Sequence, residues 1–286
     1  RGAPVNVHAA PARAPARRRA ATDDLLVQEA CTIADAAREA GVHLRLLGAL
    51  AIHLHSEGWE ALGRRLARLG DADTRFTDLD FAAYGKERSG VRTLLENRFG
   101  LEMNAQAMLF HGKERLLYAH PSKRYHVDVF FDRLSFSHTI EFGEPGTGRL
   151  DRDFPTLAPA DLLLSKLQIH RFTEKDMKDI VLLLRAHAVA AGEQANAVNA
   201  ARVCEPLAGD WGFWKDATTN LAAVRNAARR LQSEGVLEPA DAEDITGKVD
   251  RLLAAIAAAP KARTWLKAER KLAGRQWWDD VEEVVR

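Results

Sequence analysis

The sequence predicts an α+β fold, in which a mixed β-sheet with flanking helices comes first and an all-helical C-terminal domain follows. Helical and strand periodicities alternate between residues 22 and 100. Several strand-like runs then follow in quick succession, separated by turn residues. From residue 195 onward we expect only helices. We therefore divide the 286 residues into a tail, 1–21, a sheet domain, 22–150, and a helical domain, 151–286.

Composition narrows the classes of function. The chain has 41 basic and 40 acidic residues, so its net charge gives no sign of polyanion binding. The tail is rich in Arg, Ala and Pro but lacks the apolar stretch of a secretory signal, and we expect it to be disordered. Cys31 and Cys204 are distant and predict neither a disulfide framework nor a zinc site. No apolar run approaches the roughly 18 residues that span a bilayer. We expect a cytoplasmic protein without membrane contact.

The elements of the sheet domain follow from local spacing and from residues that start or stop helices. Thr22 suits the N-cap of a first helix, which Gly41 ends. Alternation predicts a strand over 42–46, and Gly48 then makes a turn into a helix over 49–55. The remaining predictions are helices over 59–69 and 91–99 and strands over 77–84, 101–110, 115–120, 125–131 and 135–142.

The helical domain shows clear start signals. Pro159 suits the first position of a helix that continues to about residue 169. Thr173 suits the N-cap of the next helix, with Asp176 three residues later in a variant of the capping box. Asp210 suits the cap of a long helix. Another helix is predicted over 240–258, and the last one is predicted to include Trp265, Trp277 and Trp278.

Three strand carboxylates are the candidate functional residues. Asp78 and Asp80 are two residues apart in a strand, and a period of two places both on one face. Asp128 lies within the apolar strand over 125–131, with Val127 and Val129 on the opposite face. Carboxylates held close together need a neutralising partner, and a hard divalent cation is the usual one. The pattern therefore predicts a metal site made of these three residues.

Such a set suits in-line displacement at phosphorus assisted by one or two divalent ions. Asp78 and Asp80 would bridge the ions, while Asp128 would complete the ion that activates an acceptor hydroxyl and would accept its proton. Gly48 would let the backbone approach a triphosphate and present N–H groups to it. We therefore expect Asp78, Asp80 and Asp128 to serve as both catalytic residues and metal ligands.

The order of these features resembles a known family. A strand, a Gly turn and a helix, then alternating hydrophobic and Asp residues, then a later strand Asp, are similar to the nucleotidyltransferase superfamily, which includes polymerase beta and the antibiotic nucleotidyltransferases. The segments 75–81, 162–169 and 175–180 resemble the AbiEii-like branch, which includes toxins of toxin–antitoxin systems. This resemblance, over roughly residues 44–187, implies a nucleotidyltransferase-type sheet. It also implies transfer of a nucleoside monophosphate from an NTP, with two Mg²⁺ ions and release of pyrophosphate.

The resemblance also implies residue roles and partners. It places Lys166 on the triphosphate and gives Asp179 a supporting role. The residues expected around the nucleotide are Gly48, Ala49, Arg75, Thr77, Lys166 and Asp179. The acceptor hydroxyl could belong to a tRNA, as in the toxins, to a small molecule or to a protein, and an antitoxin partner is implied with the toxin hypothesis. Ala49 stands where the family usually has Gly or Ser. This departure supports an alternative, a catalytically silent binding protein with the same fold.

Overall fold

A five-stranded mixed sheet is the centre of the first half of the molecule. The computed structural model describes residues 16–70, 76–105, 114–272 and 274–280. The sheet has the order β1-β2-β5-β4-β3. Its strands are β1 (Leu44–Leu47), β2 (Asp78–Ala83), β3 (Glu102–Met103), β4 (Arg115–Ala119) and β5 (His126–Phe131). Strands β2 and β5 are parallel, and the other neighbours are antiparallel. The predicted α+β class with a mixed sheet is confirmed.

Four helices accompany this sheet: α1 (Ala16–Glu39), α2 (Gly48–Leu54), α3 (Glu60–Leu66) and α4 (Arg88–Thr93). Helix α4 continues into a π-helical turn, Leu94–Arg98. Helix α1 ends as predicted, because Gly41 has φ +71° and the Val42 N–H bonds back to the Ala37 carbonyl. Its predicted start at Thr22 was wrong, because the helix already begins at Ala16. The predicted tail, 1–21, therefore overlaps α1.

Two strand predictions in this half need correction. The run over 101–110 forms only the two-residue strand β3, while residues 106–110 lie outside the described residues. The run over 135–142 is not one strand but a hairpin of β6 (Arg133–Ser135) and β7 (Thr139–Glu141). The chain reverses because the Phe136 N–H bonds to the His138 carbonyl, and Ser137 and His138 at the tip are buried. Local periodicity cannot predict this burial, because it depends on contacts with elements that are distant in the sequence.

The second half contains helices α6 (Pro159–Leu167), α7 (Glu174–Ala186), α8 (Ala200–Gly209), α9 (Trp211–Ser233), α10 (Pro239–Ala258) and α11 (Arg263–Leu272). The start signals are confirmed. Pro159 occupies the first turn of α6, and Thr173 and Asp176 form a reciprocal capping box on α7. The Asp210 carboxylate accepts a hydrogen bond of 3.0 Å from the Phe213 N–H at the start of α9.

Two predictions for this half were wrong. The chain after residue 195 is not only helical, because β9 (Ala197–Asn199) pairs in parallel with β8 (Ala188–Ala190). The last helix ends at Leu272 and does not reach Trp277 or Trp278. Gly274, with φ +82°, follows it, and the Trp277 indole N–H then donates to Asp216 of α9. A tertiary contact thus holds this segment in a non-helical path.

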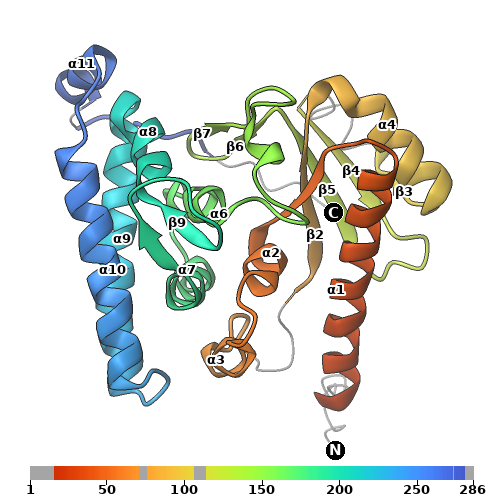
Figure 1. Ribbon diagram of the computed structural model, residues 1–286, viewed down its shortest axis with the longest axis horizontal. Helices are drawn as coiled ribbons and strands as arrows, with labels where there is room; N and C mark the ends of the chain where they lie inside the picture. Colours follow the sequence, from red (N-terminus) through yellow and green to blue (C-terminus); the bar gives the residue numbers. More distant parts are fainter. Residues whose placement is uncertain (1–15, 71–75, 106–113, 273, 281–286) are drawn as a thin grey trace, which may run out of the picture.

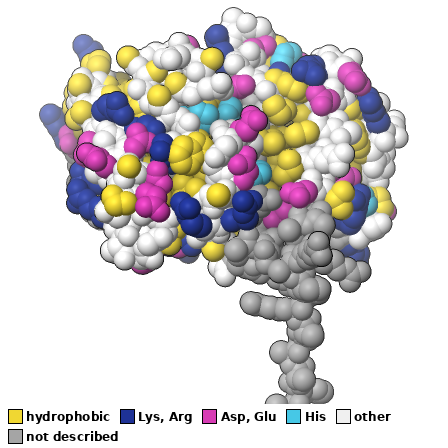
Figure 2. Space-filling model, turned by 60° about the horizontal axis from the view of Figure 1, so that its bottom comes forward, with side chains coloured by type: hydrophobic (Ala, Val, Ile, Leu, Met, Phe, Trp, Pro, Cys, Tyr) yellow, Lys and Arg dark blue, Asp and Glu magenta, His cyan; other side chains and the backbone are white. Residues whose placement is uncertain are grey.

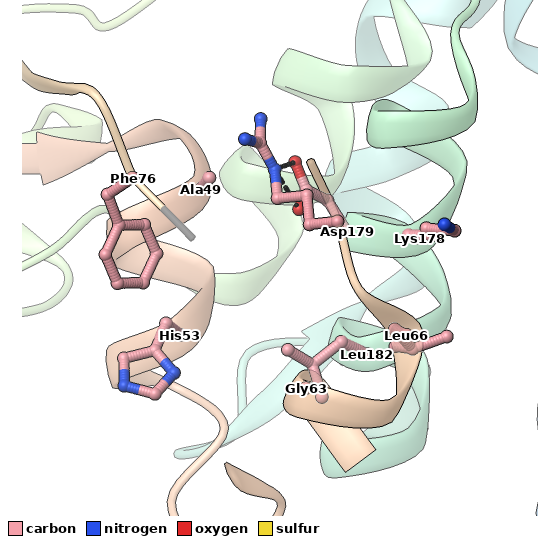
Figure 3. A pocket seen from close by; sticks show the side chains of 9 residues that line it. Ala49, His53, Gly63, Leu66, Phe76, Lys178, Asp179 and Leu182 are labelled. Atoms are coloured by element: carbon pink, nitrogen blue, oxygen red, sulfur yellow. Dashed lines mark hydrogen bonds and ion pairs between the residues drawn. The ribbon is translucent and has the colours of Figure 1, made fainter. Parts of the chain in front are cut away.

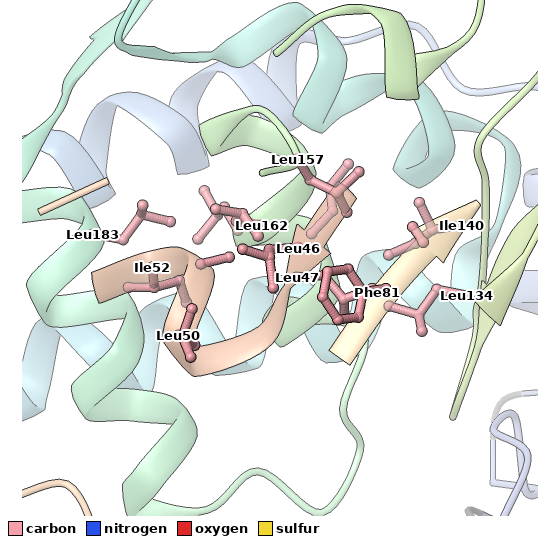
Figure 4. Close-up of a cluster of buried hydrophobic side chains, with 14 of the residues drawn as sticks. Leu46, Leu47, Leu50, Ile52, Phe81, Leu134, Ile140, Leu157, Leu162 and Leu183 are labelled. Carbon is pink, nitrogen blue, oxygen red and sulfur yellow. The ribbon is translucent and has the colours of Figure 1, made fainter. Parts of the chain in front are cut away.

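The two halves share a hydrophobic core. Figure 1 shows the sheet with α1 and α4 in one half, helices α6 to α11 in the other, and α2 and α3 between them. Backbone bonds of 2.9 Å from the Leu46 N–H to Pro155 and from the Leu157 N–H to Leu46 place residues 155–157 beside β1. Figure 4 shows Ile52 of α2 beside Leu183 of α7, and Leu47 beside Leu162 of α6. Helix α2 is therefore packed by both halves.

No helix within the described ranges combines the length and apolar character that crossing a membrane requires.

Candidate functional site

The three predicted carboxylates lie on one face of the sheet. In the parallel pairing of β2 with β5, Asp80 is opposite Asp128 and Asp78 is opposite His126. Residues paired across neighbouring strands share a face, and the strands lie about 4.8 Å apart. Between the acids, Leu79 and Val127 face the other way and are fully buried. The alternation expected from the sequence therefore brings Asp78, Asp80 and Asp128 to neighbouring positions.

The turn at Gly48 lies directly against one of these carboxylates. Gly48 has φ +75°, and a Cβ placed on it would lie 2.7 Å from Asp80 Oδ2. Real Cβ atoms do not approach an oxygen so closely, so a side chain here would displace the carboxylate. Leu47, the residue before the turn, pairs with Asp80 across β1 and β2. Glycine is thus required at position 48 for two reasons: the positive φ angle, and the lack of room for a Cβ beside the Asp80 carboxylate.

The acids differ in exposure and in their neighbours. Asp128 is 4% exposed, whereas Asp78 and Asp80 are half-buried. The Thr77 hydroxyl donates a 2.8 Å hydrogen bond to Asp78, and Arg115 Nη1 lies 3.9 Å from Asp128 Oδ2. Within the described residues, no group of three His, Cys, Asp or Glu side chains is already gathered as a metal site. That the three carboxylates share ions therefore stays a prediction.

A pocket opens beside this face, between α2, α3 and α7. Its walls are mostly apolar and are made by Ala49, His53, Gly63, Leu66, Phe76 and Leu182. Figure 3 shows Ala49, His53 and Phe76 on one side and Asp179, Lys178 and Leu182 on the other. The His53 and Phe76 rings lie 5.3 Å apart at a tilt of 51°. Arg68, Lys178 and Asp179 supply the charged part of the lining.

Asp179 connects this pocket to a buried ionic network. Lys166 Nζ lies 2.8 Å from Asp179 and 2.9 Å from Asp176, and Arg68 Nε lies 2.8 Å from Asp179. Burial alone would lower the pKa of Lys166, but the attraction of both carboxylates outweighs it, and that pKa is raised. Burial would raise the pKa of Asp176, yet the Lys166 charge and the Thr173 hydroxyl lower it. Lys166 and Asp176 are therefore held in their ionised forms.

The structure brings together most of the residues predicted to surround the nucleotide. Ala49 and Asp179 line the same pocket, and Gly48 touches Asp80. Lys166, only 8% exposed, reaches the pocket through Asp179 rather than lining it. Thr77 is exposed beside Asp78. Arg75 lies outside the described residues.

Seven of the nine residues that line the pocket were not among the predicted site residues: His53, Gly63, Leu66, Arg68, Phe76, Lys178 and Leu182. Phe76 and Lys178 lie in the segments 75–81 and 175–180 that carry the family resemblance, and Arg68 lies in a group of arginines between Gly48 and the acidic strand, but none of the three was assigned a role. Nothing in the periodicity of 59–69 or 173–187 shows that α3 packs beside α7. The pocket is a product of tertiary packing, and its members come from segments more than 100 residues apart.

The surface around this region carries charge of both signs. Figure 2, which brings the bottom of Figure 1 forward, shows basic and acidic side chains interspersed, with hydrophobic side chains between them. This distribution agrees with the formal net charge of +1. The face therefore does not have the single-sign potential that steers a large polyanion.

What the site can do chemically follows from its own residues. Three carboxylates offer hard oxygen ligands, the Gly48 turn offers close backbone approach, and the pocket offers apolar walls with two cations. Compared with known proteins, the chain matches no family model, no curated protein and no solved structure.

Proposed function

We propose that this chain is a Mg²⁺-dependent nucleotidyltransferase, which moves a nucleoside monophosphate from an NTP to an acceptor hydroxyl. The observation that carries the proposal is the pairing of Asp80 with Asp128, on one face with Asp78 and against the Gly48 turn. Arg115 already supplies one positive charge beside the buried Asp128, and three carboxylates close together on one face favour the binding of further cations. A function that brings cations to this face explains why three acids stand together.

The donor set fits Mg²⁺. This ion prefers carboxylate oxygens and is usually held by one or two carboxylates together with substrate phosphates. Asp78, Asp80 and Asp128 would hold two such ions. When bound, the ions supply charge that offsets the attacking and leaving oxygens and lowers the pKa of the attacking hydroxyl.

Each neighbouring residue then has a role in group transfer. Asp128 accepts the proton of the acceptor hydroxyl, whose oxygen forms a bond to the α-phosphorus of the NTP. The bond from that phosphorus to the bridging oxygen breaks, and pyrophosphate leaves. Gly48 keeps the backbone close to Asp80, so that the turn and the acids border the same space. Nothing larger than glycine would leave the carboxylate where it is.

We assign the small apolar pocket beside the carboxylates to one part of the nucleoside. The rings of His53 and Phe76 and the side chains of Leu66 and Leu182 offer an apolar surface to a base or sugar. Arg68 contributes positive charge at the side where Asp179 lies. We assign Lys166 a positioning role, because it holds Asp179 and so orients Arg68, rather than direct contact with the triphosphate.

The acceptor is a further part of the proposal. The resemblance to the AbiEii-like branch supports a toxin-like enzyme that acts on tRNA and has an antitoxin partner. A small molecule or a protein hydroxyl are the other acceptors that fit the same chemistry, since the transfer step is identical for any hydroxyl.

The test is transfer of label from each α-³²P-NTP with Mg²⁺ to RNA, protein or small molecules of a cell extract. The variants are Asp80→Asn and Asp128→Asn, with Asp35→Asn as a matched control on the exposed face of α1. We expect label transfer by the wild type and by the control. Each site variant should lose at least about 100-fold, as is typical when a group that stabilises transition-state charge is removed.

If the folded wild type transfers no label to any acceptor, the enzyme proposal is wrong. Equilibrium binding of NTP to the same sample then distinguishes the silent binding protein from a protein with another function. Equal transfer by wild type, Asp80→Asn and Asp128→Asn would also contradict the assignment of these carboxylates.

A further inference from the structure

Helix α11 carries a stripe of cations that the proposed catalytic site does not use. Arg263, Lys267, Arg270 and Lys271 stand at positions i, i+4, i+7 and i+8, which at 100° per residue fall on one face. All four are exposed. The helix has one acidic residue, Glu269, which lies on a different face of the helix from the four cations. The four charges span about 12 Å along the helix axis.

These cations are not neutralised by their surroundings. None of the four forms an ion pair or a side-chain hydrogen bond with any residue that the structure describes, and the same holds for Arg275 just beyond the helix. By contrast, Arg225 and Arg230 of the neighbouring helix α9 are both paired with acids, at 2.9 and 2.7 Å. Like charges on adjacent turns repel one another, so the stripe is stabilised by a ligand of opposite charge.

The stripe is held on a rigid support. On the other side of α11, Trp265 is 6% exposed, and its ring lies 5.2 Å from that of Trp214, edge to face. The Ala262 N–H and the Thr264 hydroxyl donate to the carbonyls of Ala208 and Gly209 at the end of α8. Figure 1 shows α11 at one end of the molecule, beside α8 and α10. The basic face therefore points away from the packed body.

This packing argues against a lipid surface as the partner. A helix that lies in a membrane interface inserts its apolar face among the lipids. Here the apolar face is already occupied by α8 and α9, and Leu266, which is 44% exposed, is more exposed than Trp265 and Leu272, the other large apolar side chains of α11. The stripe consists of Lys and Arg side chains with no exposed aromatic ring among them on which a base could stack, which suits contact with the phosphate backbone.

We propose that the α11 stripe, Arg263, Lys267, Arg270 and Lys271, docks the phosphate backbone of RNA without sequence preference. Each cation neutralises one phosphate, and the binding energy comes largely from release of counterions. The choice of RNA over DNA rests on the proposed function, because an RNA hydroxyl is one of its acceptors. Docking at α11 would hold that RNA on the protein while its reactive end is at the carboxylates.

The test compares the wild type with Lys267→Gln/Arg270→Gln/Lys271→Gln. A matched control, Lys123→Gln/Arg229→Gln/Arg251→Gln, removes three exposed cations elsewhere. Fluorescence anisotropy measures binding to a labelled RNA hairpin and to a DNA duplex of equal length over a series of salt concentrations. We expect the stripe variant to bind RNA at least about 10-fold more weakly. Its slope of log K against log salt should be shallower by roughly 2 to 3, about 0.7 to 0.9 for each lost phosphate contact.

Several results would overturn the proposal. These are absence of RNA binding by the wild type, equal losses in the stripe variant and the control, or tighter binding to DNA than to RNA. Stripe-dependent binding to vesicles containing phosphatidylserine without RNA binding would instead assign α11 to a membrane surface. Thermal unfolding of all variants shows that exposed substitutions left the fold intact.

The Asp80→Asn variant separates this inference from the proposed function. It should bind RNA as the wild type does, because Asp80 lies on the sheet and not on α11. RNA binding through the stripe without label transfer in any sample would refute only the catalytic proposal. Label transfer that is unaffected by the stripe variant, together with unchanged RNA binding, would refute only the docking proposal.

Discussion

Gly48→Ala is the substitution that tests the contact between the turn and the carboxylates most directly. An Ala Cβ at this position would lie 2.7 Å from Asp80 Oδ2, well inside ordinary van der Waals contact. The nearest atom is the end of a side chain, so Asp80 can rotate away while the backbone stays. The expected structural effect is a displaced carboxylate in an otherwise folded protein.

Two magnitudes follow from this geometry. Placing Ala at a left-handed φ of +75° costs about 1–2 kcal/mol of folding free energy. For a chain of this size that lowers Tm by only a few °C. A displacement of several tenths of an ångström in a catalytic group costs much more in rate, since a misplacement near 1 Å can cost about 100-fold. We therefore expect nucleotidyl transfer to fall by roughly 10- to 100-fold with a small change in Tm.

Gly235→Ala is the matched control for this experiment. Gly235 has nearly the same φ, +74°, but no atom lies within 4 Å of the position that a Cβ would take there, and it connects α9 to α10. Both variants should lose similar stability by differential scanning calorimetry. Only Gly48→Ala should lose activity in the label-transfer assay. If the two variants keep equal activity, the close approach of the turn to Asp80 has no catalytic meaning and the reasoning is refuted.

Three further predictions concern stability. Lys166→Met leaves two buried carboxylates without the cation that they share, and it should lower the free energy of unfolding in urea by about 3–5 kcal/mol. Arg98→Gln, which removes an exposed ion pair, should change that free energy little, and equal effects of the two substitutions would contradict the role of the buried network. Burial lowers the pKa of His55, so the unfolded chain binds its proton more readily. Stability should then fall as pH drops below about 6.5, and His55→Gln should flatten a plot of Tm against pH. Asp216→Asn weakens the contacts that hold residues 274–280 on α9 and should increase protease cleavage there; an unchanged cleavage rate would show that other contacts suffice.

Local signals were enough to predict the elements that carry the acids. Alternation of Asp78 and Asp80 with buried apolar residues predicted both the strand β2 and the face on which the acids lie. The capping box of Thr173 with Asp176 was equally visible, because both partners are within one helical turn. These predictions succeeded because the physical cause and its effect lie within a few residues.

Elements determined by distant contacts were not predictable in this way. The segment containing Trp277 has helical spacing in the sequence, but its indole N–H is bound by Asp216, 61 residues earlier. His138 and His170 bond to the same carboxylate, at 2.8 and 3.0 Å, from the β6–β7 hairpin and from the loop after α6. One buried acid thus organises three segments that periodicity treats separately. A pattern of spacing within a window cannot contain that information.

In the candidate site, too, some features follow from the local sequence and others depend on distant contacts. Alternation within one strand predicted that Asp78 and Asp80 share a face, whereas the grouping of Gly48 and Asp128 with them was expected from the chemistry of the set and the family resemblance, because the pairing of β2 with β5 is a long-range contact. It assigned Lys166 to the triphosphate, whereas the structure shows that side chain between Asp176 and Asp179. Which cation lines the pocket depends on how α3 meets α7, and that packing brings in Arg68.

Helix α2 contacts both the sheet and the helical half of the molecule. Its first residue lies against Asp80, the next residue lines the pocket, and Ile52 is fully buried in the core. The same helix packs against α6 and α7, while residues 155–157 are hydrogen-bonded beside β1. Rotation of the helical half relative to the sheet would therefore have to break backbone bonds and uncover core side chains. The pocket wall from α7 and the carboxylates from the sheet are consequently held at one spacing, and under the proposed function we expect an NTP to enter by side-chain movement rather than by separation of the two halves.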